Sequence, residues 1–229
     1  MSVPLPFIDR AQAGRLLADR LSGHDLRDAI VYALPRGGVP VAFEIALRLD
    51  APLDLALVRK IGAPGQPELA LAAVVDGDHP RLVVNEVVRR ATHASPAFLE
   101  EGRARELAEI ERRRKLYFGS RSRPDPRGKT AIVVDDGLAT GSTALAAIRA
   151  QRDQGVARVI LAVPVAPADT AAGMRREVDE LVVLAEPEVF RGVGSFYEDF
   201  HQLDDREVLS LLARSQAFGG SRTGSVGEP

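Results

Sequence analysis

Residues 130–143 read Thr130-Ala-Ile-Val-Val-Asp-Asp-Gly-Leu-Ala-Thr-Gly-Ser-Thr143, and the rest of the chain is interpreted outward from them. The apolar, β-branched run Ile132–Val134 predicts a short buried strand. Two carboxylates, Asp135 and Asp136, follow it, and after a turn of small residues a helical pattern begins at Ser142. A helix N-terminus offers unpaired N–H groups and a positive dipole end. The stretch therefore predicts a phosphate-binding turn.

The two carboxylates would repel a phosphate unless they bind another part of the same ligand. Side chains that only accept hydrogen bonds suit a vicinal diol such as that of ribose, or a Mg²⁺ ion. A phosphate site beside a diol site indicates a ribose 5-phosphate. An ordinary Asp-Gly turn with Ser142 as helix N-cap is the alternative interpretation of the same residues.

The same pattern of strand, Gly-bearing turn and helix occurs earlier in the chain. A strand over 29–34 runs into Pro35-Arg-Gly-Gly38, and a helix over 39–49 follows. The next strand, 53–58, ends in Arg59-Lys60. This alternation predicts an α/β fold with a doubly wound, mainly parallel sheet and helices on both faces. Ligands in such sheets bind outside the carboxyl ends of the strands, so we expect three polar strand ends to meet in one crevice.

These motifs resemble those of the type I phosphoribosyltransferases. Val134-Asp-Asp-Gly-Leu-Ala-Thr-Gly-Ser-Thr143 is similar to the phosphoribosyl-pyrophosphate signature of that family, and the GxxxxGK[ST] spacing of a Walker loop is missing. Leu34-Pro-Arg-Gly-Gly38 stands where the family has its pyrophosphate loop, in which a non-proline cis peptide, here Pro35–Arg36, can occur. Val58-Arg-Lys-Ile-Gly-Ala-Pro64 looks like the Arg-Lys loop of the adenine and orotate members. The resemblance covers roughly residues 29 to 143.

The resemblance implies transfer of the phosphoribosyl group of phosphoribosyl pyrophosphate to a nitrogenous base, with release of pyrophosphate. It implies Mg²⁺ as cofactor, bound through the substrate, with Asp135 and Asp136 as further candidate ligands. The implied catalytic residues are Asp135, Asp136 and Arg36. The implied ribose and 5-phosphate residues are Asp135, Asp136, Ala139, Thr140, Gly141, Ser142 and Thr143. The implied pyrophosphate residues are Arg36, Gly37, Gly38, Arg59 and Lys60, and Phe190, Phe196 and Tyr197 are candidates for stacking on the base.

Two departures from the family pattern leave the base unassigned. Ala139 stands where members acting on 6-oxopurines usually have an acidic residue, which favours the adenine or orotate pattern. Yet Ala63 stands where those members often have a lysine. A non-catalytic regulator of the same fold, binding phosphoribosyl pyrophosphate or a nucleotide, is the second interpretation. A doubly wound domain with an unrelated loop is the third.

The chain is interpreted as one domain over 1–215. Its expected parts are a helix over 7–21 with Asp9 as N-cap, a flexible or helical insertion at about 62–128, and a small hood at about 186–203. The insertion contains a charged helix over 97–116, in which the basic cluster Arg112–Lys115 is taken as a solvated helix end. A Gly/Ser-rich polar tail, 216–229, is expected to be disordered.

Composition excludes several other classes. The formal charge of −2 argues against nucleic acid as a partner. The absence of cysteine excludes disulfides, a thiolate nucleophile and a cysteine-based metal site. No apolar segment is long enough to span a bilayer, and no signal-peptide core is present before Asp9 and Arg10. We therefore expect a cytoplasmic protein without a membrane partner, with a homodimer as a candidate assembly.

Overall fold

A five-stranded parallel sheet forms the centre of the computed structural model, which describes residues 5–76, 80–119 and 123–216. Its strands lie in the order β2 (Leu53–Leu55), β1 (Ala29–Ala33), β6 (Thr130–Val134), β7 (Arg158–Val165) and β8 (Glu180–Ala185). Neighbouring strands are all parallel. β1, β2 and β6 consist of apolar residues almost throughout, as expected for strands covered on both faces.

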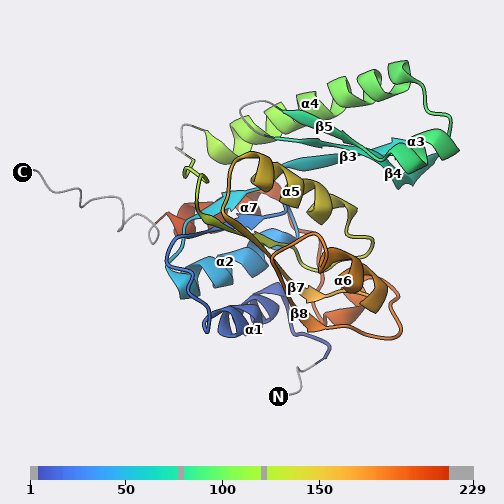
Figure 1. Ribbon diagram of the computed structural model, residues 1–229. Coiled ribbons are helices and arrows are strands. Elements are labelled where there is room, and N and C mark those ends of the chain that lie inside the picture. The colour runs from blue at the N-terminus through green and yellow to red at the C-terminus, as the bar shows by residue number, and fades with distance from the viewer. Residues whose placement is uncertain (1–4, 77–79, 120–122, 217–229) are drawn as a thin grey trace, which may run out of the picture.

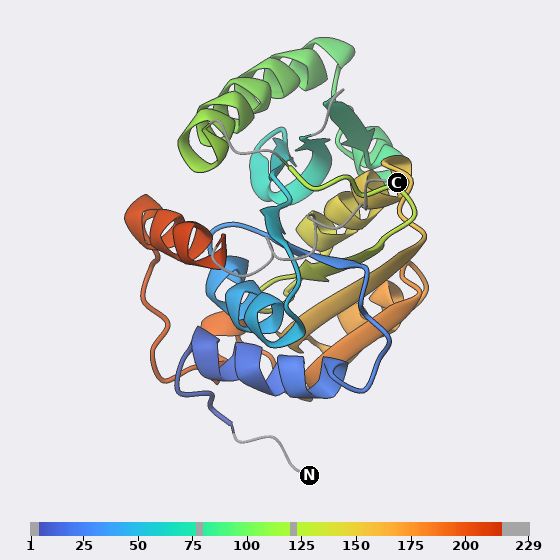
Figure 2. The same ribbon diagram turned by 90° about the vertical axis from the view of Figure 1, so that its left-hand side faces the viewer.

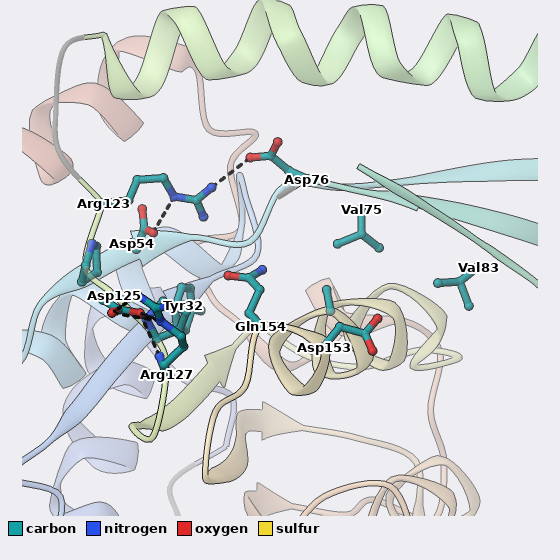
Figure 3. Close-up of a pocket in the computed structure, with 13 residues that line it drawn as sticks. Tyr32, Asp54, Val75, Asp76, Val83, Arg123, Asp125, Arg127, Asp153 and Gln154 are labelled. Carbon is teal, nitrogen blue, oxygen red and sulfur yellow. Dashed lines mark hydrogen bonds and ion pairs between the residues drawn. The ribbon is translucent and has the colours of Figure 1, made fainter. Parts of the chain in front are cut away.

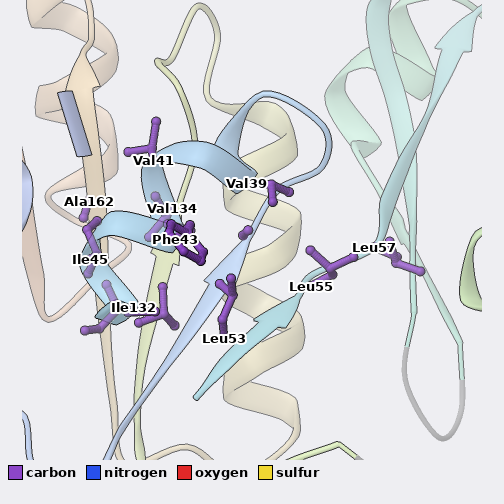
Figure 4. Packing of buried hydrophobic residues seen from close by; sticks show 14 of the residues in the cluster. Val39, Val41, Phe43, Ile45, Leu53, Leu55, Leu57, Ile132, Val134 and Ala162 are labelled. Atoms are coloured by element: carbon purple, nitrogen blue, oxygen red, sulfur yellow. The ribbon is translucent and has the colours of Figure 1, made fainter. Parts of the chain in front are cut away.

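Helices cover both faces of this sheet, as Figures 1 and 2 show. One face carries α1 (Arg10–Leu21), α2 (Gly38–Leu49) and α7 (Asp205–Ser215), and the other carries α5 (Ser142–Asp153) and α6 (Ala168–Met174). Side chains alternate along the strands, so Ile132 and Val134 pack toward α2 while Ala131 and Val133 pack toward α5. Figure 4 shows Ile132 and Val134 in the α2 cluster. The doubly wound α/β prediction is confirmed.

A second sheet lies beside the first. It is antiparallel, in the order β3 (Val58–Ala63), β4 (Gln66–Val75) and β5 (Arg81–Val84), and is followed by α3 (Glu86–Ala91) and α4 (Pro96–Phe118). It lies between α4 and α5 (Figure 1). Ala72 and Val74 join the cluster that includes α4, while Ala73 and Val75 pack with Ala146 of α5.

Two predictions fail because of this small sheet. The strand predicted over 53–58 is two strands, since the chain leaves the central sheet after β2 and enters the small sheet at Val58. The insertion predicted as flexible or helical at about 62–128 begins with strands and a hairpin, while its predicted charged helix over 97–116 is present as α4. The Gly and Pro residues of 61–67 mark that hairpin and a register shift around Gly62.

The segment predicted as a hood, 186–203, is irregular apart from a 3₁₀ turn at Val193–Phe196. It pairs with the start of the chain, where the Phe7 amide donates to the Phe196 carbonyl and the Glu198 amide donates to the Phe7 carbonyl, each at 2.8 Å. Asp9 caps α1 as predicted, accepting from the Gln12 amide. Within the described part of the chain, no helix is long and apolar enough to cross a membrane. The predicted tail 216–229 lies outside the described residues except for Gln216.

Candidate functional site

The carboxyl ends of β1 and β6 bring two of the predicted motifs together. The Leu34 amide donates to the Val134 carbonyl at 2.8 Å, so the turn 35–38 lies directly beside Asp135 and Asp136. The peptide bond between Pro35 and Arg36 is cis, as the resemblance implied. Loop 35–38 and the 134–143 stretch therefore form two walls of one site.

Gly37 and Gly38 are required by this close contact. A Cβ atom on Gly37 would lie 2.1 Å from Oδ2 of Asp136, and one on Gly38 would lie 2.6 Å from the Val134 carbonyl oxygen. Both distances are too short for atoms that are not bonded to each other, so only glycine lets the two strand ends approach this closely. Gly37 and Gly38 therefore allow the loop to pack against the carboxylate pair.

The turn after the carboxylates leads directly into the N-terminus of α5. Gly141 is the N-cap residue at φ = 72°, a left-handed conformation that favours glycine. A Cβ there would also lie 3.0 Å from Sδ of Met174. Thr140 and Ser142 lie at the same end with their hydroxyl oxygens 3.1 Å apart. The first amides of a helix have no intrahelical acceptor, so this end combines N–H donors, two hydroxyls and the positive dipole end.

The two carboxylates differ in their surroundings. Oδ1 of Asp135 accepts from the Asp136 amide at 2.9 Å. Burial, together with the negative charge of Asp136, raises the pKa of Asp135 well above its usual range. Asp136 instead forms an ion pair with Arg10, whose Nε lies 2.8 Å from Oδ2. One carboxylate is therefore neutralised within the protein, while the other is held in a position that a cation or hydroxyl donors would stabilise.

Arg10 is the site residue that the sequence analysis missed. It is the first residue of α1 and is only 7% exposed. Besides Asp136, its guanidinium donates to the His201 carbonyl at 3.0 Å and lies 3.9 Å from the centre of the Phe200 ring. Arg10 and Asp136 are 126 residues apart in the sequence, and no local pattern links them.

The predicted pyrophosphate cations Arg59 and Lys60 lie within β3 and not at the end of a central strand. As adjacent strand residues they face opposite sides of the small sheet. Arg59 points to α4 and pairs with Glu106 at 3.0 Å. Lys60 lines a cavity of about 330 Å³ together with Ser142, the first residue of α5. The expected convergence of three central strand ends is thus wrong for Arg59, while Lys60 opens onto the same cavity as α5.

The three aromatic candidates are placed differently. The rings of Phe190 and Phe196 stack with their centres 5.5 Å apart, and both are half-buried. Tyr197 is buried, and its ring contacts the rings of Phe7 and Phe200. Its hydroxyl donates to the Asp136 carbonyl at 2.6 Å. Tyr197 therefore has no open ring face for a base and supports the backbone of the carboxylate pair.

A family model describing the phosphoribosyl transferase domain matches residues 9–200 of the chain, which include both walls of the site, Arg10 and Tyr197. The chain belongs to this family.

Known relatives of this phosphoribosyl transferase domain agree with that result. Two curated proteins of Mycobacterium tuberculosis, from strains CDC 1551 and H37Rv, carry the provisional name of phosphoribosyl transferase and are 44% identical over 209 residues. The match covers 91% of this chain and 47% of each relative, so the chain spans about half their length. The crystal structure of TT1426 from Thermus thermophilus superposes with a TM-score of 0.80 at 39% identity, covering 91% of this chain and 98% of that one.

The phosphoribosyl transferase domain also contains a larger cavity away from the two strand ends. It measures about 520 Å³ and lies near the far end of α5, where Asp153 and Gln154 line it (Figure 3). Arg123 bridges Asp54 of β2 and Asp76 after β4, with nitrogen–oxygen distances of 2.9 and 3.2 Å. Asp54 and Asp76 come from the two different sheets, so this charged cluster joins them.

The basic cluster Arg112–Lys115 is largely neutralised within the structure. Arg112 and Arg113 both bond to Glu109, and Lys115 lies 3.6 Å from Glu111. Arg114 lies 3.6 Å from Asp76. Lys115 and Arg112 are exposed, as expected for a solvated helix end, whereas Arg113 and Arg114 are partly buried against their partners.

Proposed function

We propose that this domain is a phosphoribosyltransferase that transfers the phosphoribosyl group of phosphoribosyl pyrophosphate to a nitrogenous base and releases pyrophosphate. The observation that carries the proposal is the carboxylate pair Asp135–Asp136, placed between the 35–38 loop and the N-terminus of α5. This arrangement offers hydrogen-bond acceptors to the ribose diol and donors to the phosphate on either side of it.

The 5-phosphate is assigned to the turn 139–143. The amides at the start of α5 and the hydroxyls of Thr140, Ser142 and Thr143 are donors of the right kind for a dianion. Ala139, which is exposed, contributes backbone only. Its carbonyl already accepts from the Thr170 hydroxyl at 2.9 Å, which fixes the shape of the turn.

Pyrophosphate is assigned to the 35–38 loop and to the cations around it. Arg36 is the basic residue of this loop and follows its cis peptide bond. Lys60 faces α5 from the small sheet and is the stronger candidate of the β3 pair, since it opens onto the cavity at the start of α5 while Arg59 points to α4. We therefore keep Arg36 and Lys60 as the principal cations, with Arg59 in a supporting role.

Mg²⁺ fits this site as an ion held mainly by the substrate. Within residues 5–76, 80–119 and 123–216 no group of three or more His, Cys, Asp or Glu side chains is placed to hold a metal. Asp135 and Asp136 supply two carboxylates, and magnesium commonly binds through one or two carboxylates plus substrate phosphates. When bound, the ion would neutralise charge on the departing pyrophosphate.

The chemistry then rests on positioning and charge. As pyrophosphate leaves, positive charge develops at C1 of the ribose. Asp135 and Asp136 hold the ribose from the carboxylate side while Arg36 and Lys60 hold the leaving group. The incoming base is assigned to the side of Phe190 and Phe196, whose half-buried rings offer a planar surface. The identity of the base stays open.

Incubation with labelled phosphoribosyl pyrophosphate, Mg²⁺ and a panel of purine and pyrimidine bases tests the proposal. Formation of a labelled nucleotide together with pyrophosphate is the expected result. Binding of phosphoribosyl pyrophosphate without turnover on any base would instead assign the site to a non-catalytic regulator of the same fold. Absence of binding would overturn both assignments.

A further inference from the structure

The Arg10–Asp136 pair joins three segments that are far apart in the sequence. Arg10 begins α1, Asp136 follows β6, and the segment 197–201 supplies further contacts to both residues. Arg10 reaches the His201 carbonyl and the Phe200 ring, and Tyr197 reaches the Asp136 carbonyl. The carboxylate of Asp136 is thus fixed from one side by Arg10 and from its own backbone by Tyr197.

Space around the Asp136 carboxylate is equally restricted. Its oxygens lie against the Cα of Gly37, where even a methyl group would overlap Oδ2. Arg10 approaches through Nε and engages Oδ2, and no other basic side chain among the described residues pairs with this carboxylate. The side chain of Asp136 is 14% exposed. Oδ2 of Asp136 is therefore held by the protein's own cation, in a position closed off by the 35–38 loop.

Without the Arg10 contact, the carboxylate pair would be less stable in its present arrangement. Asp135 and Asp136 are adjacent, and without a cation the two carboxylates would repel each other in a largely buried position. Asp136 would then turn away from its neighbour or bind a proton. Either response changes the set of acceptors offered to a ribose diol.

We propose, building on the function assigned above, that Arg10 is a positioning residue of the phosphoribosyl site. It holds Asp136 by one oxygen so that the other faces the 2- and 3-hydroxyls of the ribose. Its role concerns the ribose end of the ligand. It does not extend to the pyrophosphate end, which is assigned to the 35–38 loop and Lys60.

The test compares ligand affinities of the whole chain by calorimetry in the presence of Mg²⁺. The ligands are phosphoribosyl pyrophosphate, ribose 5-phosphate and inorganic pyrophosphate. The variants are Arg10→Met, Arg10→Lys, Asp136→Asn and the double variant Arg10→Met/Asp136→Asn. Arg15→Met is the matched control, because Arg15 lies on the same helix, is largely exposed and pairs only weakly with Glu44 at 3.5 Å.

Arg10→Met should lower the affinity for phosphoribosyl pyrophosphate and for ribose 5-phosphate by about 10- to 100-fold. This is the range for loss of one charge-assisted contact. Inorganic pyrophosphate should bind the variant as it binds the parent. Arg10→Lys should regain part of the loss because it keeps the charge but not the fork geometry. The double variant should bind these ligands no more weakly than the single variant with the lower affinity, since the two residues act as a unit. Arg15→Met should bind like the parent.

Three results would overturn the inference while leaving the proposed function intact. The first is that Arg10→Met binds ribose 5-phosphate as tightly as the parent. The second is that the affinity losses of the single variants add in the double variant. The third is that Arg10→Met loses affinity for all three ligands equally, which indicates general disruption. A parent protein that binds none of the ligands would overturn the proposed function itself. Thermal unfolding of each variant without ligand identifies any that fail to fold, and in that case the Arg10→Lys result decides.

Discussion

Nε of Arg123 lies 2.9 Å from Oδ2 of Asp54, across the junction between the two sheets (Figure 3). The same guanidinium reaches Asp76 at the end of β4. Both carboxylate side chains are only 1% exposed, so Arg123 balances two buried negative charges, and Arg114 lies 3.6 Å from Asp76 as a second cation there.

Arg123→Met should destabilise the protein by roughly 3–5 kcal/mol, because the buried Asp54 carboxylate loses its cation. Urea unfolding measures this. Arg127→Met is the control, because Arg127 is 80% exposed and pairs with Asp125 at the surface, where a salt bridge contributes up to about 1 kcal/mol. Similar small losses in both variants would show that Asp54 and Asp76 find other partners.

Gly37→Ala should remove most affinity for phosphoribosyl pyrophosphate. The added methyl group would stand 2.1 Å from Oδ2 of Asp136, so the carboxylate must leave Arg10 or the 35–38 loop must shift. Gly173→Ala in α6 is the matched control, since nothing lies within 4 Å of its Cβ position and alanine is favoured over glycine in a helix by about 1 kcal/mol. Calorimetric titration and thermal unfolding of both variants check the prediction, which parent-like binding by Gly37→Ala would contradict.

Asp135→Asn should make the ligand-free protein more stable at neutral pH. Burial raises the pKa of folded Asp135 above the unfolded value of 3.8, so the folded state holds this proton more tightly. The stabilising contribution is therefore complete below the unfolded pKa and is lost as the pH rises through the folded pKa. Asparagine does not ionise, so the Asp135→Asn variant does not lose this stability as the pH rises. Melting temperatures measured from about pH 4 upward should diverge in favour of the variant as the pH rises.

The same Asp135→Asn variant should bind ribose 5-phosphate more weakly, because a charged acceptor for the diol is gone. Higher stability with lower affinity is the pattern expected of a functional group held in an unfavourable position. A variant that is less stable than the parent at neutral pH would show that Asp135 is well solvated when ionised.

Lys60→Ala and Arg59→Ala should have different effects although the residues are adjacent. Lys60 is a proposed pyrophosphate cation that opens onto a cavity at the start of α5, so its loss should weaken binding of inorganic pyrophosphate by about tenfold, or ~1.4 kcal/mol. Arg59 pairs with Glu106 on the opposite face, so its loss should leave that affinity within about twofold and lower stability instead. Pyrophosphate titrations of both variants decide, and the reverse order of effects would place Arg59 in the site.

Local patterns explain which elements could be predicted from the sequence. The strand before Asp135, the turn at Gly141 and the helix after Ser142 follow one another directly, and each has its own residue signal. The first strand of the small sheet, β3, has no such signal. It carries Arg59 and Lys60 near its start, and the chain passes from one sheet to the other near Ala56 without a turn residue, so one longer strand was the natural prediction.

In the site too, contiguous motifs could be predicted and contacts between distant segments could not. Its two walls were predicted because each motif is contiguous. Arg10 was not, since an arginine at a helix start is commonly exposed and only the folded chain brings it to Asp136. Tyr197 was predicted as a base-stacking ring because it lies in an aromatic-rich segment, but its burial between Phe7 and Phe200 depends on the pairing of residues 7 and 8 with 196–199.

The pairing of residues 7 and 8 with 196–199 makes the start of the chain part of the ribose end. A protein shortened by its first ten residues would keep every residue of the 134–143 signature and of the 35–38 loop. It would nevertheless lose Arg10, the Phe7 ring beneath Tyr197 and the backbone bonds that hold 196–199 in place. Deletion of residues 1–10 should therefore weaken binding at the ribose end of the site although both motifs are intact.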